Sequence, residues 1–197
     1  MDALLNLQHV SHSYHTLKCE TPALRNISFS VYPGDFVAVV GPSGCGKSTL
    51  LSLISGLIEP EKGSIFLHGK PIEEQKDKIG YMLQRDELLE WRSIFRNVLL
   101  GPEIQKTLNP DIKKRAHELL KAYGLEQFES SKPSELSGGM RQRAALVRTL
   151  ILNPELLLLD EPFSALDYQT RLNVSDDIGQ IIRREKKNGP PCYSRSF

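Results

Sequence analysis

Residues 36–49 read FVAVVGPSGCGKST, and this stretch decides the fold. Its first five residues are wholly apolar, and so short a run before a glycine predicts a central parallel strand buried on both faces. From Lys47 to Ser55 the pattern becomes helical. A buried strand, a glycine turn and a helix in that order predict an α/β fold with a mostly parallel sheet.

The turn between strand and helix has the spacing of a phosphate-binding loop. Its three glycines let successive backbone N–H groups face one anion, and the helix N-terminus adds partial positive charge. Lys47 can reach the β- and γ-phosphates, and the Ser48 hydroxyl can bind Mg²⁺. Kinases, GTPases and motor ATPases share such a loop, so the reaction stays open here. The predicted nucleotide-binding residues are Gly41, Pro42, Ser43, Gly44, Cys45, Gly46, Lys47, Ser48 and Thr49.

A second glycine turn lies in residues 136–143, LSGGMRQR. Ser137 is the predicted N-cap of a helix that runs to about Leu152, and Gly138 and Gly139 expose backbone N–H groups at its positive end. The alternative is an ordinary helix cap. A chain with one nucleotide loop and a second anion-binding turn indicates that the second turn serves a nucleotide held by a neighbouring molecule.

On this stretch the sequence resembles the ABC ATPase family, whose signature LSGGQ precedes a basic helix. Met140 stands where glutamine is commonest. The resemblance covers nearly the whole chain and implies ATP as the nucleotide. It implies that residues 156–161, LLLLDE, are a buried strand whose two carboxylates emerge beside the phosphate loop. Asp160 would then hold Mg²⁺, and Glu161 would act as general base on the attacking water. The alternative is a surface Asp-Glu pair after a core strand.

The resemblance also implies roles for residues whose local sequence pattern alone indicates no function. Gln84 ends the predicted strand 79–83 and matches a glutamine that senses Mg²⁺ and the γ-phosphate. Residues 164–167 match the loop that crosses the dimer interface. Tyr14 stands where the family places an aromatic ring that stacks on adenine, although plain packing would also explain it. The implied catalytic residues are Glu161, Lys47 and Gln84, and the implied metal ligands are Ser48, Gln84 and Asp160.

The segment QRDELLEWR at 84–92 is similar to importer subunits of the nitrate, sulfonate and taurine group. Glu90 stands where that group has proline. The likeness implies two copies of the chain around two ATP, integral-membrane permease subunits that dock on this segment, and indirect contact with a solute-binding protein. A P-loop kinase or GTPase is the remote alternative, which the signature turn disfavours.

Composition excludes other classes of function. Lys plus Arg is 25 and Asp plus Glu is 24, so no basic excess points to nucleic acid. No signal peptide and no apolar run of membrane-spanning length is visible, and three cysteines without metal-ligand spacing fit a reducing compartment. We expect a cytoplasmic chain, peripheral on the inner face of the membrane through its partner.

The predicted architecture is a single domain over 1–197 with a P-loop NTPase core. Residues 1–84 and 137–187 form the nucleotide-binding core, including an N-terminal antiparallel β region, and residues 85–136 form an inserted helical subdomain. Within that insertion we expect a helix capped by Asp111 and ended by Gly124.

Residues 188–197, NGPPCYSRSF, depart from the family pattern, which has a strand and a histidine at this point. Two prolines and no apolar run predict that this tail adds no central strand. None of the five histidines lies beyond His117. We therefore hypothesise a frameshifted truncation, testable in the coding DNA. The corresponding alternative function is a module that binds ATP but hardly hydrolyses it.

Overall fold

The computed structural model describes residues 2–15, 19–161 and 192–195. The described residues fall into two compact units. The first contains the chain up to residue 81, residues 155–160 and residues 192–195, and the second contains residues 82–154 and 161.

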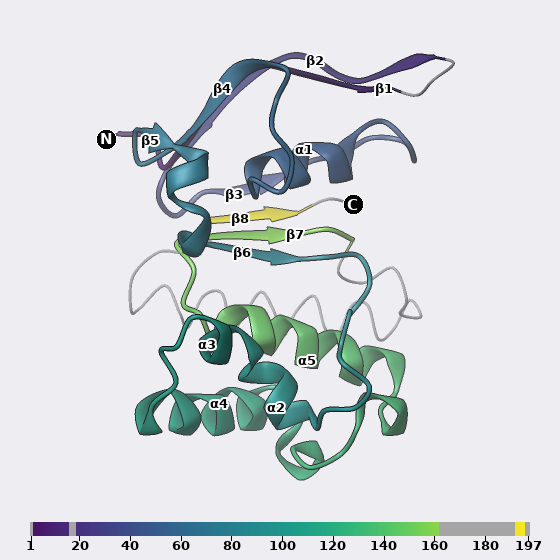
Figure 1. Ribbon diagram of the computed structural model, residues 1–197, viewed down its shortest axis with the longest axis vertical. Coiled ribbons are helices and arrows are strands. Elements are labelled where there is room, and N and C mark those ends of the chain that lie inside the picture. The colour runs from purple at the N-terminus through teal and green to yellow at the C-terminus, as the bar shows by residue number, and fades with distance from the viewer. Residues whose placement is uncertain (1, 16–18, 162–191, 196–197) are drawn as a thin grey trace. The chain divides into compact units, whose positions relative to one another are not determined.

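An antiparallel sheet in the first unit has the order β2-β1-β4-β5 (Figure 1). Its strands are β1 (Leu5–His15), β2 (Glu20–Val31), β4 (Lys62–Leu67) and β5 (Lys70–Pro71). β1 pairs with β2 from Leu5 opposite Val31 to His15 opposite Glu20, with several register shifts between. The predicted N-terminal antiparallel region is confirmed.

The second sheet of this unit has the order β3-β8-β7-β6, with β8 parallel to both β3 and β7. Its strands are β3 (Phe36–Ala38), β6 (Ile79–Met82), β7 (Leu156–Leu159) and β8 (Cys192–Arg195). All four residues of β7 are buried, as their apolar run predicted. The parallel sheet of an α/β fold is therefore confirmed.

The prediction for residues 36–40 is wrong in one respect. β3 ends at Ala38 and lies at an end of the sheet order, and Phe36 and Val40 are 49% and 71% exposed. A strand is buried on both faces only when neighbours cover it, and within the described residues β3 pairs with β8 alone. The apolar run therefore predicts the strand correctly, but it does not predict how far the strand is buried.

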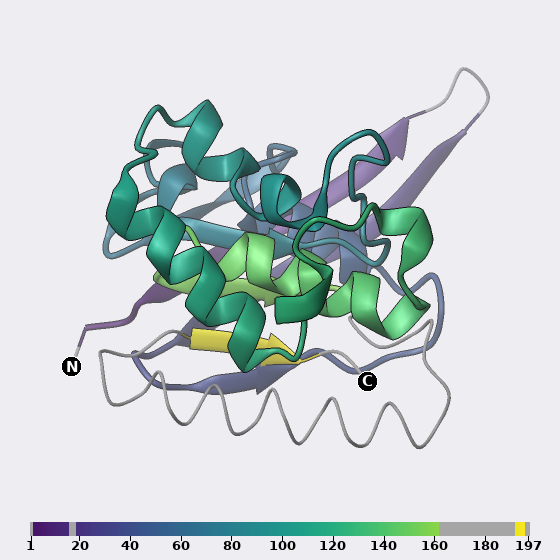
Figure 2. The ribbon, with the colours of Figure 1, turned by 90° about the horizontal axis from the view of Figure 1, so that it is seen from below.

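The prediction for the tail is also wrong. Residues 192–195 form β8, which lies between β3 and β7 (Figure 2), pairing Tyr193 with Phe36 on one side and with Leu157 on the other. Pro190 and Pro191 precede this strand in the sequence rather than interrupt it. Parallel pairing uses backbone N–H and C=O groups, which every non-proline residue carries. The lack of an apolar run therefore did not prevent a central position.

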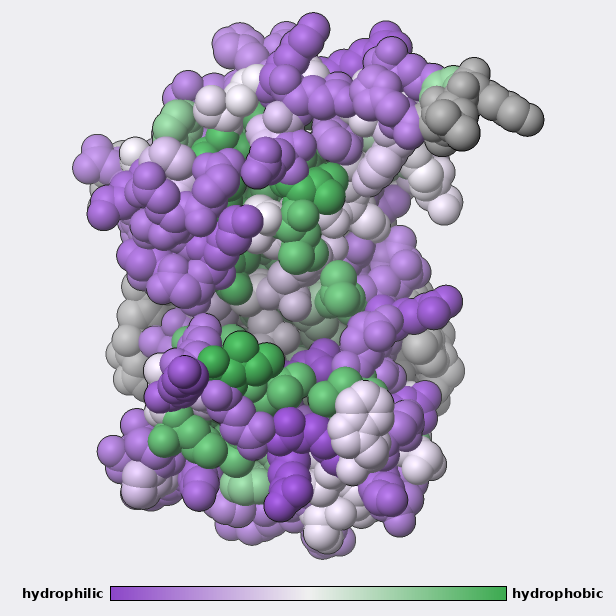
Figure 3. All heavy atoms as spheres, viewed as in Figure 1, coloured by the Kyte–Doolittle hydropathy of each residue, from purple (hydrophilic) through white to green (hydrophobic). Residues whose placement is uncertain are grey.

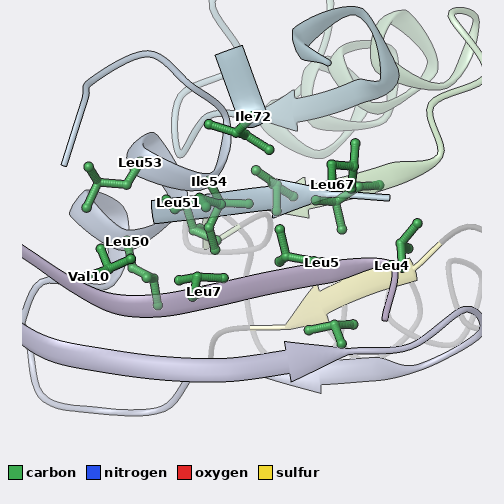
Figure 4. Packing of buried hydrophobic residues seen from close by; sticks show 14 of the residues in the cluster. Leu4, Leu5, Leu7, Val10, Leu50, Leu51, Leu53, Ile54, Leu67 and Ile72 are labelled. Carbon is green, nitrogen blue, oxygen red and sulfur yellow. The ribbon is translucent and has the colours of Figure 1, made fainter. Parts of the chain in front are cut away.

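Helix α1 (Lys47–Ile54) packs against both sheets through one hydrophobic cluster. Figure 4 shows Leu5, Leu7 and Val10 of β1 pointing toward the α1 side chains from Leu50 to Ile54. Leu156 and Leu158 of β7 belong to the same cluster. The helix that follows the phosphate loop is thus fixed by a core to which strands of both sheets contribute. Two short 3-10 turns, Ile72–Glu74 and Lys76–Lys78, connect β5 to β6.

The second unit is helical, with α2 (Ile94–Val98), α3 (Leu100–Ile104), α4 (Pro110–Ala122) and α5 (Gly138–Leu150). Two 3-10 turns, Glu126–Phe128 and Pro133–Glu135, lie between α4 and α5. The N-cap of α4 lies two residues before the predicted one, because the Asn109 side chain accepts the backbone N–H of Ile112 at 2.9 Å. Asp111 lies in the first turn instead of at the N-cap. Gly124, with φ +68°, follows the helix end as predicted.

Surface character agrees with the balanced composition. In the face shown in Figure 3, hydrophilic side chains predominate and hydrophobic ones show in smaller groups. Among the residues that the structure describes, none of the helices combines the length and the apolar character that a membrane span requires.

Candidate functional site

The phosphate loop closes around its own lysine. The Lys47 side chain is only 8% exposed, and its Nζ donates to the carbonyl oxygens of Gly41 and Pro42, each at 3.0 Å. The ammonium group is therefore held over the beginning of the loop. In contrast, Pro42, Ser43, Gly44, Cys45 and Ser48 are exposed, so a ligand can approach the loop from solvent.

Gly46 shapes the helix N-terminus behind the loop. It has φ +94°, and a Cβ at this position would lie 2.6 Å from the carbonyl oxygen of Ala23. It is the N-cap of α1 and offers no side-chain acceptor, so the first N–H groups of the helix stay available to an anion. This close backbone approach, together with Lys47, fits a phosphate group.

Tyr14 lies beside the helix that the loop opens. Its hydroxyl is 3.2 Å from Oγ1 of Thr49, and its ring is 47% exposed. The His12 ring meets it edge-on, with centroids 5.1 Å apart and planes at 87°. The structure thus brings a half-exposed Tyr14 to the helix that follows the predicted nucleotide loop.

Asp160 directly follows β7, in the same unit as the loop. Its side chain is buried, its Oδ2 accepts the Tyr81 hydroxyl at 3.5 Å, and its Oδ1 has no hydrogen-bond partner among the described residues. Burial raises the pKa of Tyr81 and the charge of Asp160 raises it further, while a hydrogen bond with Ser52 acts the other way. Tyr81 therefore stays a donor. An unpartnered buried carboxylate oxygen fits a hydrated Mg²⁺.

Gln84 and Glu161, both in the second unit, are joined directly. Nε2 of Gln84 donates to Oε2 of Glu161 at 3.0 Å. Glu161 has φ +42°, an uncommon conformation for a glutamate. The predicted general base, Glu161, and the glutamine predicted to sense Mg²⁺ and the γ-phosphate, Gln84, are thus held together.

The signature turn caps α5 as predicted. Oγ of Ser137 accepts the backbone N–H of Met140 at 3.4 Å, and Gly138 and Gly139 form the first turn of the helix. The D-loop residues 164–167 and the predicted helix 171–187 lie outside the described residues.

Sequence reasoning missed an ionic network next to this turn. Arg141 binds Asp86, and Arg148 binds the backbone of Asp86 and Glu87. Burial lowers the pKa of the Arg148 guanidinium, and the acidic charges of Asp86 and Glu87 oppose that effect. A possible signal was the acidic pair two and three residues after Gln84, but no spacing rule links it to α5.

The helical unit also carries a groove of about 550 Å³. Trp91 is 75% exposed there, and Nη2 of Arg92 pairs with Oε2 of Glu103 at 2.6 Å. The lining residues are Trp91, Arg92, Phe95, Arg96, Leu99, Glu103, Leu108 and Lys113. Three cationic side chains and one acidic side chain therefore surround an apolar floor.

A phosphate loop at the head of a helix, a carboxylate at the end of a neighbouring buried strand and a second glycine turn define an ATP-binding cassette of the P-loop class. Residues 24–164 match the family model described as ABC transporter, and the chain belongs to that family.

Relatives and solved structures agree with this assignment. The chain is 50% identical over 185 residues to the uncharacterized ABC transporter ATP-binding protein YtlC of Bacillus subtilis, covering 94% of this chain and 71% of that protein. It is 45% identical over 165 residues to the taurine import ATP-binding protein TauB of Rhizobium johnstonii, covering 84% of this chain but only 63% of that protein. Others are named for sulfate/thiosulfate and spermidine/putrescine import.

A solved structure with the same fold is the dimeric, post-hydrolysis state of the ATP-binding cassette MJ0796 bound to ADP and Pi. The TM-score is 0.85 at 29% identity, covering 98% of this chain and 87% of that one.

Proposed function

We propose that the chain binds MgATP and hydrolyses it to drive solute import through a separate membrane permease. The observation that carries the proposal is the phosphate loop, where Lys47 and the glycine-shaped N-terminus of α1 converge on one place. Membership of the ABC transporter family supports the same function.

The loop residues have the binding role. ATP supplies the phosphoanhydride that is cleaved, and Mg²⁺ neutralises phosphate charge while it is bound. Lys47 and the backbone N–H groups of the loop bind the phosphates, and the exposed Ser48 hydroxyl and the unpartnered Oδ1 of Asp160 are the donors for the metal, with Gln84 as a further ligand. The half-exposed ring of Tyr14 stacks on the base.

Glu161 and Gln84 have the catalytic role. Glu161 accepts a proton from the attacking water, and Gln84 orients that water through the hydrogen bond that joins the two side chains. Both groups must be present for turnover, but ATP binding at the loop requires neither.

A second copy of the chain completes each site. The Ser137-Gly138-Gly139 turn at the N-terminus of α5 presents backbone N–H groups and positive helix charge, which suit the phosphates of ATP held by the partner copy. Relatives with this fold have been solved as dimers.

The groove at Trp91 is the permease contact. Its apolar floor and three cationic side chains fit a permease helix that carries apolar and acidic residues. This contact would place the cassette on the inner face of the membrane. The 45% identity to a taurine import protein favours a sulfonate-like solute, which a solute-binding protein would deliver to the permease.

The test is steady-state MgATP hydrolysis by the purified chain beside the variants Lys47→Ala and Glu161→Gln. We expect Lys47→Ala to lose ATP binding, and Glu161→Gln to bind ATP but lose turnover by at least about 100-fold. Lys114→Ala, which alters an exposed side chain on α4, is the matched control. ATP bound by the wild-type chain without turnover would favour the alternative of a binding module. A wild-type chain that does not bind ATP would exclude both the ATPase function and the binding-module alternative.

A further inference from the structure

Strand β1 changes its buried face at one extra residue. Leu5 and Leu7 are 2% and 1% exposed, and both belong to the hydrophobic cluster that contains the α1 side chains. In a regular strand residue 9 would follow on that face, because side chains alternate with a period of two. His9 is exposed instead, and the fully buried Val10 takes the next place in the cluster (Figure 4). The core-facing positions therefore change from odd to even residue numbers at His9.

The pairing on both sides of β1 locates the extra residue. Residues 7–10 of β1 pair with residues 27–29 of β2, so three steps along β1 match two along its partner. Residues 8–11 pair with residues 62–64 of β4, again three steps against two. His9 lies inside both intervals and has φ +52°. It is therefore the bulge residue of β1.

The neighbouring strands are shaped to accept this bulge. Gly63 of β4 has φ +84°, and a Cβ there would lie 2.3 Å from the carbonyl oxygen of Gln8 and 2.5 Å from that of His9. Asn26 of β2 has φ +50°, and its Oδ1 is 2.8 Å from Nδ1 of His9. Glycine and asparagine are residues that adopt this left-handed conformation readily. One residue with positive φ from each of three neighbouring strands therefore contributes to the bulge.

Two serine hydroxyls hold the backbone of the bulge. The backbone N–H of His9 donates to Oγ of Ser28 at 2.8 Å, and that of Asn26 donates to Oγ of Ser11 at 2.9 Å. Each backbone donor needs an acceptor, and here side chains supply it in place of the opposite strand. These contacts fix the extra residue at position 9.

The change of face decides where Tyr14 points. It is four residues after Val10, so alternation places it on the core-facing side of β1. The His12 ring lies on the same side and meets the Tyr14 ring edge-on, and the Tyr14 hydroxyl is 3.2 Å from Oγ1 of Thr49 on α1. Without the extra residue, the alternation would turn Tyr14 to the opposite face of the sheet, away from α1.

We propose that His9 and Asn26 are positioning residues for nucleotide binding, because the bulge that they form turns Tyr14 toward the base of ATP. The inference rests on the proposed function, in which Tyr14 stacks on that base. The two residues act through the direction of β1 and do not touch the nucleotide. Lys47 is held by Gly41 and Pro42, outside β1 and β2, so binding of the phosphates does not require the bulge.

The experiment uses the full chain and two ligands, MgATP and magnesium tripolyphosphate, which carries phosphates but no nucleoside. His9→Val and Asn26→Val disfavour positive φ, because β-branched residues rarely adopt it, whereas His9→Gly and Asn26→Gly allow it. Gln8→Val is the matched control, since Gln8 is an exposed neighbour on β1 that is not among the residues with positive φ. Tyr14→Ala gives the affinity without the ring.

We expect both Val variants to bind MgATP at least about fivefold more weakly than the wild type, as Tyr14→Ala does, because the stacking on the base is lost. Their affinity for tripolyphosphate should stay at the wild-type value. The Gly variants and Gln8→Val should bind both ligands as the wild type does. Adding Tyr14→Ala to either Val variant should cause no further loss, since both changes remove the same contact.

Val variants that bind both ligands with wild-type affinity would overturn the positioning role, and so would Gly variants that lose as much as the Val variants. A Val variant that binds neither ligand is misfolded, and His9→Ala or Asn26→Ala, which disfavours positive φ less, then takes its place under the same criteria. A wild-type chain that binds neither ligand would contradict the proposed function itself. The two failures are therefore distinguishable in one data set.

Discussion

Gly46 is the residue of the phosphate loop with the tightest steric constraint. Its positive φ and the 2.6 Å approach of the Ala23 carbonyl oxygen leave no room for a side chain. We predict that Gly46→Ala lowers the free energy of unfolding by about 1–3 kcal/mol and abolishes ATP binding. Chemical denaturation and ATP titration measure the two effects.

Gly44 provides the matched comparison, because its φ is +79° but a Cβ there would meet nothing within 4 Å. Gly44→Ala should cost only the backbone conformation, about 1 kcal/mol. Equal losses in both variants would contradict the steric explanation for Gly46.

Cys45 offers a chemical test of the same loop. It is an exposed free thiol, and its Sγ lies so close to Gly41 that a Cβ on that glycine would be 2.6 Å away. We predict that maleimide labelling of Cys45 blocks ATP binding and that MgATP slows the labelling, with Cys45→Ser, which keeps Cys19 and Cys192, as the reference that shows the effect of labelling elsewhere. ATP binding that survives complete labelling of Cys45 would refute the proposed loop geometry.

At the scale of elements, Glu155 joins three parts of the first unit at the start of β7. It pairs with His68 and, at 3.2 Å, with Lys78, and its backbone N–H donates to the carbonyl oxygen of Lys78. Burial alone would raise the pKa of Glu155, but the hydrogen bonds from Lys78 and His68 outweigh it and lower the pKa below 4.5.

Because the folded state lowers this pKa, the stabilisation is present above pH 4.5 and is lost as the pH falls through the lower folded value. We predict that Glu155→Gln lowers the free energy of unfolding by about 0.5 kcal/mol at pH 7, since the pair is partly exposed. The difference between wild type and variant should shrink as the pH falls below 4.5 and through the lower folded pKa. A difference that is constant from pH 3 to 7 would assign the effect to packing.

The elements also show what local sequence determines. β7, α1 and α5 follow their predictions because their residues carry local signals, namely four buried leucines, a glycine loop and the Ser137 cap. The burial of β3 and the position of β8 in the sheet depend on which strands become their neighbours. The local sequence at residues 36–40 or 192–195 does not determine those neighbours. At α4, two candidate caps two residues apart compete, and Asn109 succeeds because Pro110 suits the first helical position.

For the candidate site, the motif residues could be predicted from the sequence, but the side chains that hydrogen-bond around them could not. Lys47, Asp160 and Ser137 follow from spacing and context. No local pattern assigns a role to Arg141 or Arg148, since their partners lie more than 50 residues earlier in the chain.

At the scale of the whole molecule, the proposed dimer predicts complementation. Lys47→Ala damages the loop of its own chain, and Ser137→Arg damages the turn offered to its partner. In a mixed dimer both defects fall on one site, and the other site is intact. An equimolar mixture of the two inactive variants should therefore recover about a quarter of wild-type ATPase activity, because half of the dimers are mixed and each has one working site of two.

Either variant alone must remain inactive in the same assay, and mixing two Lys47→Ala preparations is the negative control. No recovery in a mixture shown to exchange subunits would argue against sites shared between copies.

The order of strands in the parallel sheet has a consequence for how the chain is made. Among the residues that the structure describes, β3 and β7 are joined by pairing with β8, which the ribosome adds some 30 residues after β7. Until that strand emerges, the nascent chain holds two unfinished sheet edges, each open to pairing with another chain. The parallel sheet is therefore complete only after β8 has been synthesised. Before that point, nascent chains on the same messenger RNA would risk pairing with each other through their open strand edges.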